Sequence, residues 1–95
     1  MKNSMVITFT NPIKKDMRSR EFFADSIKEL KETKKENTLK MIQDYNFQGE
    51  YHLDIAYLQD SKCIEDEELD IVCHNGTIEE INFDDYDIAE EFYSF

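Results

Sequence analysis

The sequence predicts one α+β domain over residues 1–95, with helices early in the chain and an antiparallel sheet that those helices cover on one face. In the first half, apolar residues recur at three- and four-residue steps, which indicates helix. From Tyr51 to Tyr57, apolar and polar residues alternate, which indicates a strand. Asn75-Gly76 then separates two strand-like runs, the strongest short-range signal for a hairpin. The expected order of elements is β-α-α-β-β-β-α.

The chain is expected to open with a strand and a helix. Residues 5–10 are mostly β-branched or aromatic and predict a strand, which Asn11-Pro12 ends. The same dipeptide suits a helix start, because Asn is a favoured N-cap and Pro fits the first helical position. We expect a helix over residues 12–33, with an apolar stripe formed by Ile13, Met17, Phe23, Ala24, Ile27 and Leu30.

A second helix is expected to begin at Thr33. Thr33 and Glu36 fit a capping box, in which each side chain satisfies a backbone N–H at a helix start. The apolar stripe also loses phase here, because none of the eight residues after Leu30 is large and apolar. Gly49 is expected to end the helical region. A single long bent helix over residues 12–46 is the alternative that these signals leave open.

The second half predicts strands and one short helix. The expected segments are a strand over 51–57, a loop over 59–68, hairpin arms over 69–74 and 77–83, and a terminal helix over 86–95. The loop is expected because its residues are mostly polar and acidic. In the second hairpin arm, Glu79-Glu80 breaks the alternation, which predicts a β-bulge at that pair.

Charge is sorted by position along the chain. Residues 1–45 hold ten Lys and Arg against seven Asp and Glu, a net of +3. Residues 46–95 hold one Lys against fifteen Asp and Glu, a net of −14, and the sum is the formal −11. Like charges crowded into half of a small domain oppose its compact state, so we interpret them as serving a function.

The predicted partner-binding residues are carboxylates that cluster with almost no cation among them. Side chains on one face of a strand recur at about 6.6 Å, so rows of carboxylates can imitate the charge spacing of nucleic acid phosphates. The residues are Glu65, Asp66, Glu67, Glu68, Asp70, Glu79, Glu80, Asp84, Asp85, Asp87, Glu90 and Glu91. The alternative interpretation is a solvated surface kept soluble by its charge.

No metal, cofactor or catalytic site is expected. Asp84, Asp85 and Asp87 lack the glycine of a Ca²⁺-binding EF-hand loop, and the His and Cys residues lack zinc-site spacing. Cys73 fits a core position between alternating apolar residues. Two glycines in the whole chain leave little scope for an active-site loop, so we expect no enzyme.

The charge favours a basic nucleic-acid-binding protein, such as a nuclease or a CRISPR effector, as the partner. Direct binding to nucleic acid is not expected, because phosphate would repel a chain of this net charge. An anionic membrane surface would repel it for the same reason. The separation of charge between the two halves leaves a head-to-tail homodimer open.

These features predict a small acidic binding protein that inhibits a basic protein by occupying its nucleic-acid groove. Residues with GC-rich codons are scarce, which points to an AT-rich bacterium or its phage and hence to an anti-CRISPR or anti-restriction protein. The alternatives are an immunity protein or antitoxin against a cationic nuclease toxin, and a non-inhibitory interaction module. Two cysteines, no secretory segment and no apolar run of about 20 residues predict a cytoplasmic protein, in the host cytosol if phage-encoded.

Overall fold

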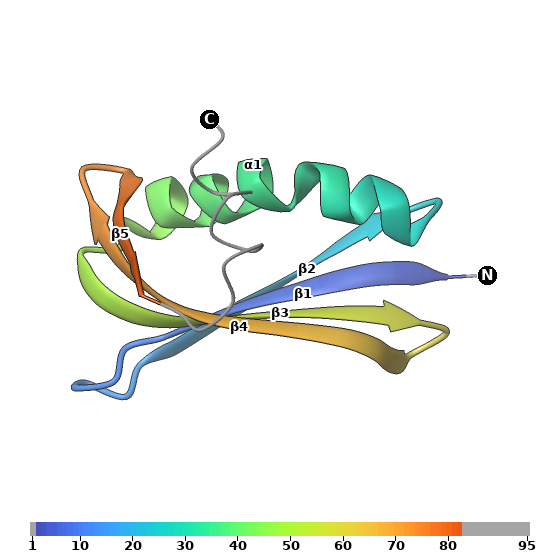
Figure 1. The fold of residues 1–95 in the computed structure, drawn as a ribbon, viewed down its shortest axis with the longest axis horizontal. Helices are drawn as coiled ribbons and strands as arrows, with labels where there is room; N and C mark the ends of the chain where they lie inside the picture. The colour runs from blue at the N-terminus through green and yellow to red at the C-terminus, as the bar shows by residue number, and fades with distance from the viewer. Residues whose placement is uncertain (1, 83–95) are drawn as a thin grey trace.

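The computed structural model describes residues 2–82, which begin with two strands rather than a strand and a helix. The elements in chain order are β1 (Asn3–Thr10), β2 (Met17–Ala24), α1 (Ile27–Tyr45), β3 (Gly49–Gln59), β4 (Lys62–His74) and β5 (Thr77–Asn82) (Figure 1). The order of the described elements is therefore β-β-α-β-β-β, and the expected order β-α-α-β-β-β-α is wrong in its first half.

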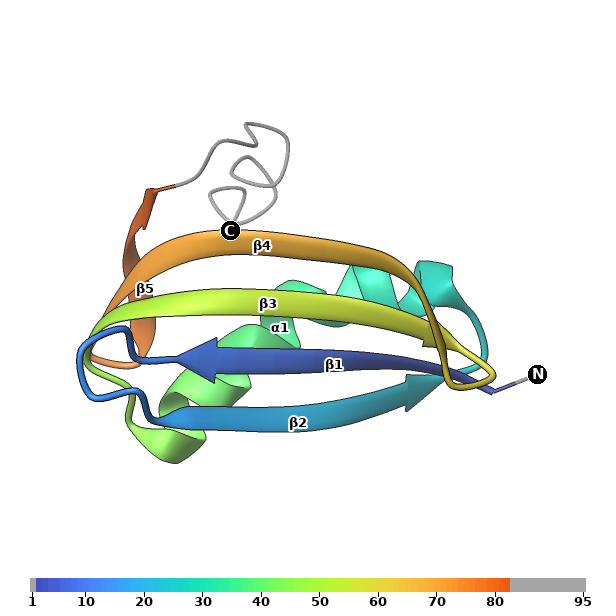
Figure 2. The ribbon, with the colours of Figure 1, turned by 90° about the horizontal axis from the view of Figure 1, so that it is seen from below.

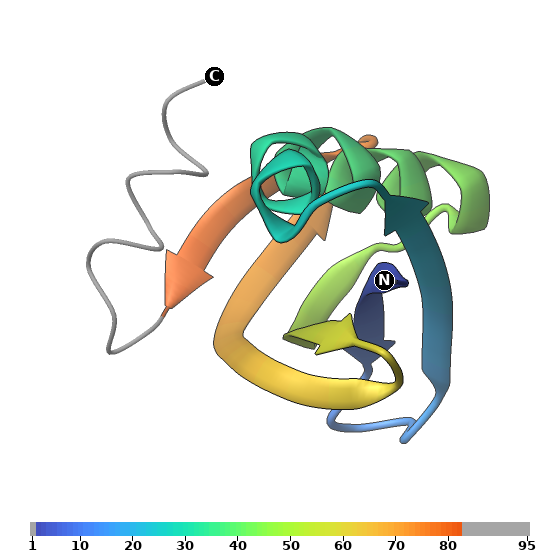
Figure 3. The same ribbon diagram turned by 90° about the vertical axis from the view of Figure 1, so that its right-hand side faces the viewer.

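The described strands form one curled antiparallel sheet in the order β2-β1-β3-β4-β5. Helix α1 lies along one face of it (Figure 1), and the edge strands β2 and β5 approach α1 from opposite sides (Figure 3). Figure 2 shows the other face of β1 to β4, which no described element covers. The predicted α+β class and antiparallel sheet are confirmed, with one helix in the described part of the chain. That helix is not long and apolar enough to cross a membrane.

The core lies between the sheet and α1. Side chains alternate along each strand, so every second residue of β1, β3 and β4 points toward the helix. The buried apolar residues are Met5, Ile7, Phe9, Leu30, Met41, Ile42, Phe47, Leu53, Ile55, Tyr57, Leu69, Ile71 and Cys73. The predicted burial of Cys73 is confirmed.

The expected helix over residues 12–33 is wrong, because residues 17–24 form the edge strand β2. Its apolar spacing also fits a strand with apolar residues on both faces. Phe22 packs against the core, whereas Met17 and Phe23 are 66% and 57% exposed. The three- and four-residue steps therefore did not mark one buried stripe.

Asn11 caps a single turn rather than a helix. Its side-chain oxygen accepts hydrogen bonds from the backbone N–H groups of Ile13 (2.9 Å) and Lys14 (2.8 Å), as an N-cap does. Lys15 then adopts a positive φ of 59°, which ends the turn and sends the chain back along β1. Asn11 therefore accepts the hydrogen bonds expected of a cap, but the predicted helix is a turn.

Helix α1 is continuous from Ile27 to Tyr45, so the predicted new start at Thr33 is wrong. The alternative of one bent helix over 12–46 is wrong as well. The N-cap is Ser26, whose side chain accepts a hydrogen bond from the Glu29 N–H at 3.2 Å. The Thr33 hydroxyl instead donates within the helix, to the carbonyl oxygen of Glu29 at 3.1 Å.

The buried face of α1 continues without interruption past Leu30, but two of its positions are polar. Lys34 and Thr38 follow Leu30 at four-residue steps, and both are buried. The Thr38 hydroxyl donates to the Lys34 carbonyl oxygen at 2.6 Å, so its burial leaves no unsatisfied hydroxyl. The helix ends at Asn46, which adopts the left-handed conformation with φ 53°, and not at Gly49, which begins β3.

The segment 59–68, predicted as a loop, is mostly strand. Only Asp60 and Ser61 form the turn between β3 and β4, with φ of 52° and 70°, and β4 begins at Lys62. The predicted loop is wrong because acidic side chains do not prevent a strand when they lie at the sheet surface or beside lysines. In β4 they alternate between the two faces of the sheet.

The remaining strand predictions are confirmed. Residues 5–10 lie in β1 and residues 51–57 in β3. Asn75 and Gly76 turn the chain between β4 and β5 with φ of 49° and 79°, as a type I′ hairpin turn requires. The terminal helix expected over residues 86–95 lies outside the described residues.

The predicted bulge in the last hairpin is also confirmed. Ile78 pairs with Cys73, and Glu80 pairs with the preceding residue of β4, Val72. Glu79 is therefore the extra residue of β5 with no partner in the register.

Candidate functional site

Strand β4 divides its acidic residues between the two faces of the sheet. Glu65 and Glu67 face α1, where each lies beside a lysine of the helix. Because side chains alternate along the strand, Asp66, Glu68 and Asp70 face the other way. The predicted cluster between residues 65 and 70 is therefore not one continuous surface.

The two helix-facing acids bind lysines of α1. Lys31 Nζ lies 2.7 Å from Glu65 Oε2, and both side chains are more than 40% exposed. Lys34 Nζ lies 2.8 Å from Glu67 Oε2, and these side chains are only 4% and 13% exposed. Glu65 and Glu67 thus lie beside cations of α1, on the face opposite Asp66, Glu68 and Asp70.

The opposite face, here called the outer face, gathers carboxylates from two adjacent strands. The register of β3 and β4 places Asp54 beside Glu68, and His52 beside Asp70. Asp66 lies two residues before Glu68 on the same face. We call Asp54, Asp66, Glu68 and Asp70 the outer acidic array. Strand β3 contains no Lys or Arg, and β4 contains one, at its first residue.

His52 bridges two acids of the array. Its Nδ1 lies 3.0 Å from Asp70 Oδ1, and its Nε2 lies 3.2 Å from Glu68 Oε1. Both ring nitrogens donate hydrogen bonds only in the protonated imidazolium form. The hydrogen bond with Asp70 is the main reason that the pKa of His52 is raised. His52 therefore adds positive charge to the array as the pH falls.

Asp54 is the most perturbed acid of the array. Carboxylate oxygens of Asp54, Asp66 and Glu68 lie within 4.8 Å of one another. The pKa of Asp54 is raised to about 7, mainly by burial. The hydrogen bond with Asp66 and the charges of Asp66 and Glu68 raise it further. The Oδ1 atom of Asp54 is buried with no hydrogen-bond partner among the described residues. At neutral pH, Asp54 is thus about half protonated.

Three carboxylates this close invite comparison with a metal site. Carboxylate oxygens are the ligands that Ca²⁺ and Mg²⁺ prefer. However, Ca²⁺ takes about six to eight oxygens, and a proton on Asp54 would compete with a cation. We therefore assign no metal to this group.

The other predicted carboxylates lie apart from the array or beyond the described structure. Glu79 is exposed at the bulge of β5. Glu80 also belongs to β5, where its backbone pairs with Val72. The residues outside the described part of the chain are Asp84, Asp85, Asp87, Glu90 and Glu91.

Sequence reasoning missed Asp54, which the structure places at the centre of the array. The alternation from Tyr51 to Tyr57 does put Asp54 on the face opposite the core. Its neighbours follow only from the register between β3 and β4, which the sequence does not show.

The buried thiol of Cys73 is not a nucleophile. Burial raises the pKa of Cys73 to about 12, so the reactive thiolate is rare at neutral pH. No family model, curated protein or solved structure matches this chain. The outer face is therefore the basis for a functional argument.

Proposed function

We propose that this protein is a small acidic inhibitor that binds a basic nucleic-acid-binding protein through the outer acidic array and occupies its nucleic-acid groove. The class that fits is a phage-type inhibitor of a nuclease or other defence protein, of the anti-CRISPR or anti-restriction kind. The observation that carries the proposal is the array itself, four carboxylates on adjacent strands of a sheet face that no described element covers.

The spacing of the array supports mimicry of nucleic acid. Asp66, Glu68 and Asp70 recur at every second residue of β4, which corresponds to about 6.6 Å, and Asp54 lies on the adjacent strand about 4.8 Å away. Duplex DNA presents a charge for about every 1.7 Å of its axis. One row of three carboxylates, with Asp54 beside it, thus offers closely spaced anions to the Lys and Arg of a nucleic-acid groove.

The energetics of the free protein also support a cationic partner. The raised pKa of Asp54 shows that its ionised form is disfavoured, partly by the charges of Asp66 and Glu68. A nearby cation would relieve this repulsion and favour ionisation of Asp54. A bound partner would therefore stabilise an arrangement that costs free energy in the unbound protein.

We also propose that the protein acts by binding and not by catalysis, and that it acts in the cytoplasm, which is the host cytosol if a phage encodes it. Cys63 is exposed and Cys73 is buried, and both are free thiols. Free cysteines are typical of a reducing compartment.

The proposal is tested by capturing a partner from host cytosol on the immobilised protein at about 50 mM salt and eluting it at high salt. We expect a basic nucleic-acid-binding protein that DNA or RNA also displaces. The array variant Asp66→Asn/Glu68→Gln should lose this capture. The control variant Glu32→Gln/Glu36→Gln changes net charge equally, at exposed positions of α1, and should keep it.

The outcomes separate the function classes. A partner that nucleic acid does not displace would contradict groove occupation and indicate a non-inhibitory interaction module. A captured toxin nuclease would indicate an immunity protein or antitoxin. Equal loss of capture in the array and control variants would show that net charge, and not the outer face, determines binding.

A further inference from the structure

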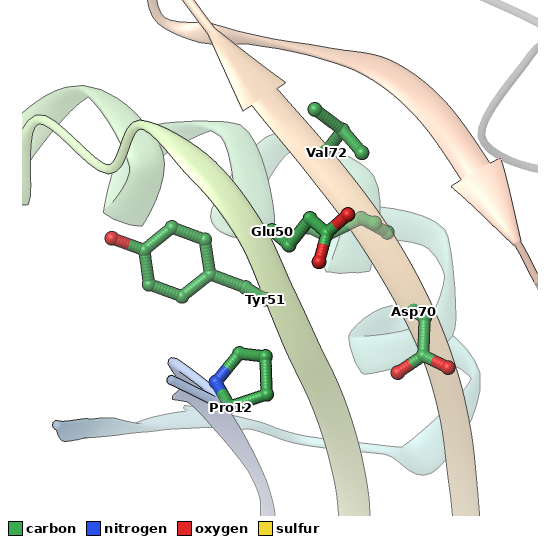
Figure 4. Close-up of a pocket in the computed structure, with 6 residues that line it drawn as sticks. Pro12, Glu50, Tyr51, Asp70 and Val72 are labelled. Carbon is green, nitrogen blue, oxygen red and sulfur yellow. The ribbon is translucent and has the colours of Figure 1, made fainter. Parts of the chain in front are cut away.

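A hollow of about 270 Å³ adjoins the outer acidic array (Figure 4). The residues that line it are Pro12 from the turn after β1, Glu50 and Tyr51 from β3, and Asp70, Ile71 and Val72 from β4. Pockets for small molecules usually measure about 300–1,000 Å³. The smaller volume here suits one side chain of a partner.

The hollow combines apolar walls with carboxylates. Val72 is half-buried and shares the face of Glu50 and Asp70, whereas the side chains of Tyr51 and Ile71 point to the core side of the sheet. Glu50 is exposed, and the side chain of Asp70 is 69% exposed. Figure 4 shows the two carboxylates and Val72 over β4, with the ring of Tyr51 beside β3. None of the lining residues carries a positive charge.

The ring of Tyr51 packs on the core side of β3, because Tyr51 alternates in phase with the buried Leu53 and Ile55. The ring of Tyr51 lies 4.8 Å from that of Phe47 and 6.0 Å from that of Phe9, measured between centroids. Phe9 and Phe47 are both buried. These core contacts hold the backbone of β3 beneath the hollow in place before a partner binds, which lowers the entropic cost of binding.

We propose that this hollow receives an arginine side chain of the basic partner. The guanidinium group lies between the carboxylates of Glu50 and Asp70, and its methylene stem packs on Val72. Asp70 uses Oδ1 with His52, and we assign Oδ2 to the guanidinium. This inference rests on the proposed function and specifies one group of the partner, an arginine, that would bind at one end of the outer face.

The strand register explains why arginine fits better than lysine. Glu50 lies opposite Val72, so Glu50 and Asp70 are diagonal neighbours about 7–8 Å apart, with a somewhat shorter distance between their β-carbons. The planar guanidinium has five donors in a fixed fork and can reach two carboxylates, whereas the lysine ammonium is a compact point charge.

Other occupants fit the hollow less well. An apolar side chain would desolvate Glu50 and Asp70 without offering them a donor, which is unfavourable. A bare metal ion would make no use of the apolar walls. Charge complementarity and shape together select a long cationic side chain.

The test uses arginine and lysine homopeptides of equal length as probes, at low salt. Calorimetry measures their affinity, and NMR follows the methyl groups of Val72. The pocket variant is Glu50→Gln/Asp70→Asn, and the matched control is again Glu32→Gln/Glu36→Gln. We expect wild type to prefer arginine, the Val72 methyl signals to shift, and the pocket variant to bind arginine peptide about tenfold more weakly.

Several results would overturn the inference: Val72 signals that do not move, no preference for arginine in wild type, or a preference that survives in the pocket variant. The control variant should lose less than about threefold in affinity, as expected for the general field alone. The capture experiment separates this inference from the proposed function. If the array variant loses the partner but the pocket variant keeps it, the arginine site is contradicted and the proposed function is not. A wild type that captures no basic protein contradicts the proposed function itself.

Discussion

Asp54 sets the charge of the outer acidic array near neutral pH, because its pKa is raised from 3.8 to about 7. The folded state therefore binds this proton more tightly than the unfolded chain does. The resulting contribution to stability is fully present below a pH of about 4 and is lost as the pH rises through about 7. Asp54→Asn removes that loss, so the variant should exceed wild type by about 1–2 kcal/mol at pH 8, after allowance for solvent screening on an open face.

Urea unfolding of both proteins at pH 5 and pH 8 measures this effect. The gain should be clearly smaller at pH 5, where wild-type Asp54 is already protonated in the folded state. The pKa of His52 is also raised, and its titration shifts stability in the same direction, but His52 is present in both proteins. An equal gain at the two pH values would refute the raised pKa of Asp54.

Lys34 and Glu67 form a buried ion pair. Here we expect a substitution to destabilise the protein, in contrast to the gain expected at Asp54. Lys34→Ala removes the cation that faces a carboxylate only 13% exposed, which should cost about 3 kcal/mol. The double variant Lys34→Met/Glu67→Leu replaces both charges with apolar groups of similar size and should recover most of that loss. Thermal or urea unfolding measures both, and a double variant as unstable as Lys34→Ala would contradict this account.

At the scale of elements, the structure starts α1 after the N-cap Ser26, whereas the sequence predicted a helix start at Thr33. Ser26→Ala removes the N-cap and should destabilise the protein by about 1 kcal/mol. Thr33 lies inside the helix, where alanine has the higher helix propensity, so Thr33→Ala should be neutral within about 0.5 kcal/mol. Urea unfolding of the two variants decides between the two helix starts. A larger loss at Thr33 would favour the capping box predicted there.

The elements that the sequence predicted correctly are those with a strong local signal. The alternation in β3 and the Asn75-Gly76 turn each specify structure within a few residues. Strand β2 and the first half of β4 depend on tertiary partners, namely β1 beside the edge strand and the α1 lysines beside Glu65 and Glu67. Their local patterns therefore resembled a helix and a loop.

The same distinction applies to the outer acidic array. Period-two alternation in β4 would have separated Asp66 and Glu68 from the acids that face α1, had the segment been recognised as a strand. The contribution of Asp54 needs the register of β3 against β4, which is a property of the folded sheet. Composition thus predicted an acidic surface, and the fold determines which carboxylates form it.

At the scale of the whole molecule, long-range repulsion competes with a few exposed ion pairs. The chain carries a net charge of −11, and this self-repulsion opposes the compact state. The pairs of Arg20 with Asp44 and of Lys31 with Glu65 are partly exposed, and such pairs contribute about 0–1 kcal/mol each. Salt screens both effects, so its net influence on stability shows which is larger.

We expect repulsion to dominate, so that sodium chloride raises stability by about 1 kcal/mol, or about 4–8 °C in Tm, between low and near-molar salt. The array variant Asp66→Asn/Glu68→Gln already lacks part of the repulsion, and its Tm should rise less. The control variant Glu32→Gln/Glu36→Gln loses the same charge beside the lysines of α1 and should respond as wild type does. Calorimetric scans of the three proteins make the comparison. A wild-type Tm that falls with salt would mean that the ion pairs outweigh the repulsion, and the outer acidic array would then carry no energetic cost for a partner to relieve.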